Sequence, residues 1–336
     1  MIGIWLYGAA LLIAGATAAF ATPLIFRLAT HVGMLDLADD RRVHESPTPR
    51  IGGIAVYLGF SFALFSVLGF ALERAAFFHD IDDIHKLLGL LFGGTLILGV
   101  GLWDDIMTMP PRNKFFAQIV VASISMLYGF VIPFINNPLT GATIYIPTYL
   151  GVPLTLLWYL GMMNAINFID GLDGLLAGVA AISGLFLFSI ALLHHHSVVA
   201  LVVISLAGAA LGFLPYNFNP ARIFLGDSGS LFVGYVFATV SIIGVSKVAI
   251  SISLLVPLLI LALPILDTAA AIARRALSGR RITEADRGHF HHQLIFRYGL
   301  NVRQAVLLIY AVCFILGAVA VILSGGLHGF TKTAGL

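Results

Sequence analysis

The segment NAINFIDGLDG, residues 164–174, places two carboxamides and two carboxylates in an otherwise apolar sequence. Burying such groups without partners costs roughly 2 kcal/mol or more each, and an unpaired charge costs more. Asn and Asp side chains offer hydrogen-bond donors and acceptors that suit the edge of a base or a ribose. We therefore expect Asn164, Asn167, Asp170 and Asp173 to line a site for a polar ligand.

Three further acids stand at the ends of apolar runs. Asp104 and Asp105 are adjacent, and Lys114 follows a few residues later. Adjacent carboxylates repel each other, so they need solvent, a metal ion or cationic partners. A solvated helix end would satisfy them most simply. Asp227 lies in a Gly-Asp-Ser-Gly sequence at the start of another run, where it can cap the helix or hold a cation beside the free N–H groups.

Basic residues accompany these acids in two segments. Arg50 stands beside Gly52 and Gly53, which indicates either a simple turn or an arginine that faces a phosphate. The segment 274–299 is rich in arginine and contains three histidines, which are His289, His291 and His292. These histidines could bind zinc, although no Cys is near and no fourth ligand is evident, and a basic segment also fits anionic lipid head groups.

The elements that position these residues are expected to be membrane-spanning helices. Of the 336 residues, 60% are apolar and 10% are charged, against roughly 25% charged in an average soluble domain. The composition predicts an all-α polytopic integral membrane protein with about ten transmembrane helices, each near the ~20 residues that cross a bilayer. The expected spans are 3–26, 51–72, 87–103, 115–135, 149–165, 174–193, 197–215, 230–246, 249–273 and 304–325.

The distribution of charge predicts the orientation of these spans. Four of the 18 Lys and Arg residues fall in the even-numbered gaps or at the chain ends, and the other fourteen fall in the odd-numbered gaps. This excess predicts that the odd loops are cytoplasmic and that both ends lie outside. Twelve of the sixteen acids fall on the same side, which favours an active-site cleft at the cytoplasmic face. The longest polar segment, 274–303, is too short for a separate core, so we expect one transmembrane domain over residues 1–336.

Taken in order, these segments resemble the polyprenyl-phosphate N-acetylhexosamine-1-phosphate transferases (glycosyltransferase family 4), the bacterial lipid-carrier enzymes of the WecA and MraY type. The matching motifs are Pro49–Gly53, Asp104-Asp105, Lys114, Asn164–Gly174, Phe224–Ser230 and the closing H-x-H-H at His289, His291 and His292. That closing motif is similar to the WecA-like branch, which uses simple UDP-acetamido sugars. Many members of that branch carry a third acid where this chain has Thr108.

The resemblance implies a Mg²⁺ ion, with Mn²⁺ as the alternative, and a role for each matched residue. The expected metal ligand is Asp227, with Asp104 and Asp105 close by. The expected catalytic residues are Asp104, Asp105, Lys114, Asp227, His289, His291 and His292, with Lys114 and the histidines holding the diphosphate and sugar. The expected substrate-binding residues are Arg50, Asn164, Asn167, Asp170, Asp173, Asn217 and Phe224, the last as a ring that stacks on the base.

The implied reaction moves an N-acetylhexosamine 1-phosphate, with GlcNAc-1-phosphate favoured, from a UDP-sugar to undecaprenyl or another polyprenyl phosphate. UMP leaves, and the lipid-linked product starts a cell-surface glycan. The expected location is the bacterial inner membrane, with the bilayer as partner, no nucleic acid, and a homodimer left open. Asp104 acts either as a base or through its charge. The alternative is a membrane transporter with acidic sites on the cytoplasmic side, although transporter sites usually lie near the midplane. A non-catalytic scaffold would not explain why the acids gather on one side.

Overall fold

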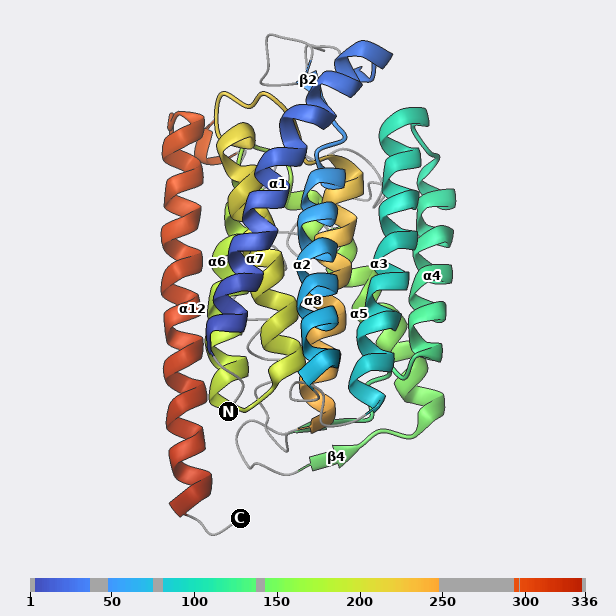
Figure 1. Cartoon of the computed structure of the whole chain (residues 1–336), viewed down its shortest axis with the longest axis vertical. Helices are drawn as coiled ribbons and strands as arrows, with labels where there is room; N and C mark the ends of the chain where they lie inside the picture. Colours follow the sequence, from blue (N-terminus) through green and yellow to red (C-terminus); the bar gives the residue numbers. More distant parts are fainter. Residues whose placement is uncertain are drawn as a thin grey trace.

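The computed structural model describes residues 4–36, 48–74, 81–136, 143–247, 293–295 and 297–333, and these form mainly long helices (Figure 1). The described helices are α1 (Ile4–Val32), α2 (Gly53–Arg74), α3 (Ile81–Met107), α4 (Pro111–Leu127), α5 (Thr148–Ile169), α6 (Leu175–Leu193), α7 (Ser197–Asn217), α8 (Gly226–Lys247) and α12 (Val302–Thr333). The described strands are β1 (Leu35–Asp36), β2 (Thr48–Pro49), β3 (Phe134–Asn136) and β4 (Thr143–Tyr145).

Eight of the described helices are long and apolar enough to cross a membrane, which confirms an all-α polytopic membrane protein. The ninth, α4, has 17 residues and ends at Leu127. The expected span 115–135 was therefore wrong at its C-terminal edge, because β3 occupies residues 134–136. The expected span 249–273 lies outside the described residues, so the total of ten spans stays a prediction.

Two short antiparallel strand pairs were not predicted from the sequence. In one, Leu35 pairs with Pro49, so that β1 and β2 join the end of α1 to the approach to α2. In the other, β3 and β4 pair with Phe134 opposite Tyr145 at the opposite end of the bundle (Figure 1). Strands of two or three residues are too short to show the alternation of apolar and polar residues that identifies a strand in a sequence.

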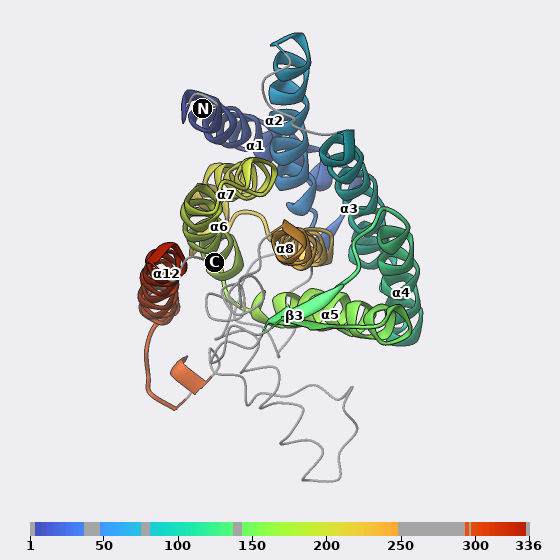
Figure 2. The same cartoon turned by 90° about the horizontal axis from the view of Figure 1, so that it is seen from below.

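Helix α8 lies in the middle of the bundle, with α2, α3, α5, α6 and α7 around it (Figure 2). Within its most apolar 18-residue window 94% of the residues are buried, against 28% for the peripheral helix α12. Its mean hydropathy is nevertheless the lowest among the eight candidate spans. A helix that is enclosed by protein can carry polar side chains, because neighbouring helices rather than lipid surround them.

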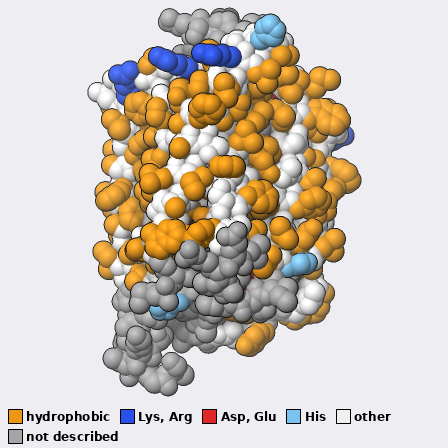
Figure 3. Space-filling view, viewed as in Figure 1, with side chains coloured by type: hydrophobic (Ala, Val, Ile, Leu, Met, Phe, Trp, Pro, Cys, Tyr) orange, Lys and Arg blue, Asp and Glu red, His pale blue; other side chains and the backbone are white. Residues whose placement is uncertain are grey.

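Apolar side chains cover most of the outer surface of the bundle in the view of Figure 3. The Lys and Arg side chains that are visible on this face gather mainly near the end of the bundle that carries β2 (Figures 1 and 3). Exposed aromatic and aliphatic residues such as Phe20, Phe62 and Phe314 are suited to contact with lipid tails rather than with water. This face therefore has a wide apolar band with basic side chains mainly at one end, as suits a membrane-spanning bundle.

The turn before α2 is fixed against the turn before α8 by backbone hydrogen bonds. The N–H of Gly52 donates to the carbonyl of Phe224 at 2.9 Å, and the N–H of Gly53 donates to the carbonyl of Leu225 at 2.8 Å. In return, the N–H of Phe224 donates to the carbonyl of Pro49 at 2.8 Å. These bonds bring the first loop of the chain to the N-terminus of the central helix.

A substitution at Gly53 tests the close approach of α2 to α8, because a Cβ atom at this position would overlap the backbone nitrogen of Gly229 in α8. We expect Gly53→Ala to lower the thermal unfolding midpoint in detergent, at a cost of about 1–3 kcal/mol for overpacking. Gly69→Ala is the matched control in the same helix, because nothing lies within 4 Å of its added Cβ. Alanine there should be neutral or stabilising, since alanine favours helix. Equal midpoints for the two variants would contradict the close approach.

Candidate active site

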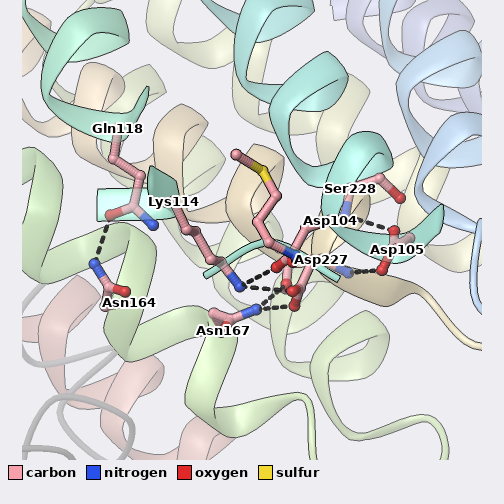
Figure 4. A network of polar contacts seen from close by, with 10 residues as sticks. Asp104, Asp105, Lys114, Gln118, Asn164, Asn167, Asp227 and Ser228 are labelled. Carbon is pink, nitrogen blue, oxygen red and sulfur yellow. Dashed lines mark hydrogen bonds and ion pairs between the residues drawn. The ribbon is translucent and has the colours of Figure 1, made fainter. Parts of the chain in front are cut away.

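Lys114 joins two of the acids that the sequence analysis singled out. Its Nζ atom lies 2.9 Å from Oδ2 of Asp104 and 2.6 Å from Oδ2 of Asp227 (Figure 4). Asp104 lies near the C-terminal end of α3, Lys114 in the first turn of α4, and Asp227 in the first turn of α8. The ammonium group therefore offsets the repulsion between two carboxylates from different helices. The structure thus brings Asp104, Lys114 and Asp227 together.

Asp105 has different partners from its neighbour Asp104. Its Oδ1 accepts a hydrogen bond from the N–H of Asp227 at 2.7 Å, and its Oδ2 accepts one from the N–H of Ser228 at 2.9 Å (Figure 4). These two N–H groups belong to the first turn of α8, where backbone donors have no partner within their own helix. Asp105 thus caps a helix from another helix, and its negative charge lies at the positive end of the helix dipole.

Gly226 makes room for this cap. It has a φ of +75°, in the left-handed region that favours glycine, and a Cβ atom there would overlap the carbonyl of Arg50 and press on Oδ2 of Asp105. Glycine at this position therefore allows both the first loop and Asp105 to lie close to the start of α8.

Asn167 completes the cluster from α5. Its Nδ2 atom donates to Oδ1 of Asp227 at 2.5 Å and to Oγ of Ser230 at 2.7 Å. Asp104 receives a further hydrogen bond from the backbone N–H of Met109 at 2.6 Å. Each described carboxylate of the cluster is thus held by donors from other elements, so its position is fixed before any ligand binds.

Asp173 and Asn217 connect the two loops beside the cluster. Oδ2 of Asp173 accepts hydrogen bonds from Nδ2 of Asn219 at 2.9 Å and from the N–H of Ala221 at 3.0 Å. Asn217 is buried, and its side chain bonds the N–H of Gly174 and the carbonyl of Ile223. These two residues were expected to bind substrate. In the structure they hold the loop after α5 against the loop before α8.

Asp170, at the C-terminal end of α5, lies where charge is costly. Burial, and after it the negative charges of Asp227 and Asp105, raise the pKa of its carboxyl group to about 8, although the charge of Arg50 acts to lower it. Arg50 and Phe224 flank the paired turns described above, and both are partly exposed. These three residues therefore lie beside the cluster rather than in it. The expected catalytic residues His289, His291 and His292 lie outside the described residues.

Two residues of this region were missed in the sequence. Gln118 follows Lys114 by one turn of α4, and its Oε1 accepts a hydrogen bond from Nδ2 of Asn164 at 2.7 Å (Figure 4). Tyr310 of α12 donates its hydroxyl to the carbonyl of Gly174, at the start of α6. A polar residue four positions after Lys114 in an apolar helix is a signal that could have identified Gln118. Tyr310 gives no such signal in its apolar run.

The described residues form no group of three or more His, Cys, Asp and Glu side chains arranged to hold a metal ion. Asp104 and Asp227, however, present two carboxylates that share one cation, Lys114. Mg²⁺ is commonly held by one or two carboxylates together with substrate phosphates and water. The donor set therefore fits a magnesium ion that is completed by a phosphorylated substrate, with Asp105 engaged as a helix cap.

Known proteins similar to this chain match it over most of its length. The profile described as glycosyl transferase family 4 matches residues 87–245, which include the whole cluster. The chain is 36% identical to a probable undecaprenyl-phosphate N-acetylglucosaminyl 1-phosphate transferase of Bacillus subtilis (strain 168), over 91% of this chain and 82% of the relative. It is 36% identical to a decaprenyl-phosphate N-acetylglucosaminephosphotransferase of Mycobacterium leprae (strain TN), over 89% and 80%. It is 31% identical to a phospho-N-acetylmuramoyl-pentapeptide-transferase of Staphylococcus aureus (strain JH9), over 75% and 78%.

The pKa of Asp170 predicts how the stability of the ligand-free protein depends on pH. Because burial and the nearby carboxylates raise this pKa to about 8, the folded protein holds a proton that the unfolded chain releases near pH 4. Stability should therefore fall as the pH rises from about 5 to 8. We expect Asp170→Asn to remove at least about 1.4 kcal/mol of this fall, which corresponds to one pKa unit. Thermal unfolding of the wild type and the variant at pH 5 and pH 8 measures this difference. An equal loss of stability between the two pH values in both proteins would contradict the raised pKa of Asp170.

Proposed function

Because this chain belongs to glycosyl transferase family 4, the polyprenyl-phosphate N-acetylhexosamine-1-phosphate transferases, we propose that it transfers N-acetylglucosamine 1-phosphate from a UDP-sugar to a polyprenyl phosphate. The single observation that carries the proposal is the cluster in which Lys114 links Asp104 to Asp227. Its three helices meet at one end of the bundle, where a water-soluble nucleotide and a lipid phosphate can meet. The donor sugar follows the names of the bacillary and mycobacterial relatives, whose identity to this chain exceeds that of the muramoyl-pentapeptide relative.

The reaction exchanges one phosphoanhydride for another. An oxygen of the lipid phosphate forms a bond to the sugar-bearing phosphorus, the bond from that phosphorus to the UMP oxygen breaks, and UMP leaves with the electron pair. The attacking phosphate has a second pKa of about 6, so it is mostly a dianion at neutral pH. No general base is needed to create the nucleophile. Asp104 already accepts hydrogen bonds from Lys114 and from the N–H of Met109, which favours an electrostatic role for this residue.

The main barrier is the approach of a dianion to a diphosphate, and positive charge in the site lowers it. Lys114 supplies one such charge and is held in place by two carboxylates. Asp227 and Asp104 would hold a Mg²⁺ ion, which when bound would neutralise charge on the diphosphate. Asn167 keeps Asp227 oriented, and Asp105 keeps the start of α8 in register with α3.

The position of the cluster also supports a membrane setting and an orientation. We infer that the end of the bundle that carries β2 faces the cytoplasm of a bacterial inner membrane, because basic side chains gather near that end (Figure 3). UDP-sugar would then reach the site from the cytoplasm while the lipid tail stays in the bilayer. A transporter is less well supported, since Asp104 and Asp227 lie at helix ends rather than in the middle of a span.

Asp227→Asn should lower the rate of transfer at least about a hundredfold, because it removes a charge from the cluster at nearly constant volume. Asp104→Asn should also be severe. The assay is formation of lipid-linked sugar diphosphate from UDP-GlcNAc and polyprenyl phosphate, and EDTA should stop it in the wild type. Asp83→Asn, at the opposite end of α3, is the control and should retain activity. Wild-type turnover by Asp227→Asn would refute the role of this carboxylate.

The balance of bonds predicts that the reaction is reversible. One phosphoanhydride replaces another, so the equilibrium constant should lie within roughly tenfold of one, or about 1.4 kcal/mol. Radiolabelled UMP should therefore enter UDP-GlcNAc when the lipid-linked product and Mg²⁺ are present. A hydrolase would instead release sugar 1-phosphate irreversibly and show no such exchange.

A further inference from the structure

A pair of side-chain amides lies one helical turn from the lysine that links the two carboxylates. Nδ2 of Asn164 donates to Oε1 of Gln118 at 2.7 Å and to the carbonyl of Leu160 at 2.8 Å (Figure 4). Gln118 is completely buried, and its Nε2 atom has no hydrogen-bond partner among the described residues. A buried donor without a partner costs about 1–3 kcal/mol, so the retention of an amide here calls for an explanation.

The carbonyl of Leu160 fixes the direction of both amides. A carbonyl oxygen only accepts, so the atom of Asn164 that faces it must be the NH₂ group. Because the same NH₂ group faces Gln118, Gln118 must present its oxygen and leave its own NH₂ group unused. The reverse arrangement of Asn164 would place two acceptors against each other. The directions of the two side chains thus follow from one backbone carbonyl.

This arrangement leaves Oδ1 as the outward-facing atom of Asn164. No described residue donates a hydrogen bond to it, and Asn164 is partly exposed. In Figure 4 this oxygen lies on the side of the amide that points away from Gln118. Asn164 precedes Asn167 by three residues of α5, and Asn167 bonds Asp227 directly. An acceptor is therefore available about one turn from the proposed reaction centre.

We propose that Gln118 is a positioning residue that holds Asn164 as a hydrogen-bond acceptor for an N–H or O–H group of the bound UDP-sugar. This inference rests on the proposed function. Gln118 touches no substrate and acts only through Asn164, since its oxygen accepts the second hydrogen bond of the NH₂ group and so holds the amide in place. Gln118 can accept the hydrogen bond from Asn164 only if its own buried NH₂ group is left without a partner among the described residues. A ligand with a donor at this point is retained, and one with an acceptor there is repelled.

The test measures steady-state kinetics of the full chain in detergent with UDP-GlcNAc and polyprenyl phosphate. Gln118→Met keeps the volume of the side chain and removes the acceptor, so the amide of Asn164 keeps only its bond to the carbonyl of Leu160 and is held less firmly. We expect the KM for UDP-GlcNAc to rise about tenfold, the loss of one neutral hydrogen bond, while kcat changes little. The double variant with Asn164→Ala should have the same KM as Asn164→Ala alone, because Gln118 acts only through that residue.

Two further measurements separate this role from a structural one. Ser125→Ala is the matched control in α4, since Ser125 is also buried and bonds the hydroxyl of Tyr235. It should lower the unfolding midpoint and leave KM unchanged. The inhibition constant of UMP locates the donor group: an unchanged value in Gln118→Met places it on the sugar, and a parallel tenfold rise places it on the uridine.

A wild-type KM in Gln118→Met would overturn the proposal, as would a double variant in which the two effects multiply. A wild-type protein that forms no lipid-linked product would instead contradict the proposed function. The two failures are therefore distinguishable.

Discussion

The cap that Asp105 of α3 places on the N-terminus of α8 is the interaction on which the rest of the site depends. Its two oxygens accept the N–H groups of Asp227 and Ser228, so they fix both the height and the rotation of the central helix relative to α3. Asp104 is the preceding residue on the same helix, about 100° away around the axis, and it therefore faces Lys114 instead. Two adjacent acids of one motif thus have distinct tasks, one structural and one electrostatic.

The long apolar runs predicted an all-α membrane protein, because they report burial in lipid directly. The resemblance to the family implied that Asp104 and Asp105 lie close to Asp227, whereas the places of Lys114 and Asn167 in the same cluster appear only in the structure. The sequence could not divide the tasks of the two adjacent acids, since that depends on which helix faces each carboxylate. The resemblance to the family implied that Asp173 and Asn217 bind substrate, whereas the contacts by which they join two loops appear only when distant segments meet.

Other features carry too little local signal to be read from a sequence. The pair β1 and β2 consists of two residues on each strand, so no alternation exists to detect. Gln118 and Asn164 are 46 positions apart, and only the packing of α4 on α5 reveals their hydrogen bond. Membership of glycosyl transferase family 4 supplies the chemistry, while the structure shows which side chains share each hydrogen bond of the cluster.

The cap between α3 and α8 also sets an order of assembly during synthesis. Asp105 and Ser228 are 123 positions apart, and Lys114 precedes Asp227 by 113. At 5–20 residues per second, about 6 to 25 s pass between the synthesis of the acids of α3 and that of the amides they cap. During that interval the carboxylate of Asp105 has water in place of the two N–H groups of α8. The space beside Asp105 must therefore stay open to water until α8 arrives, and α8 brings the partners of this carboxylate.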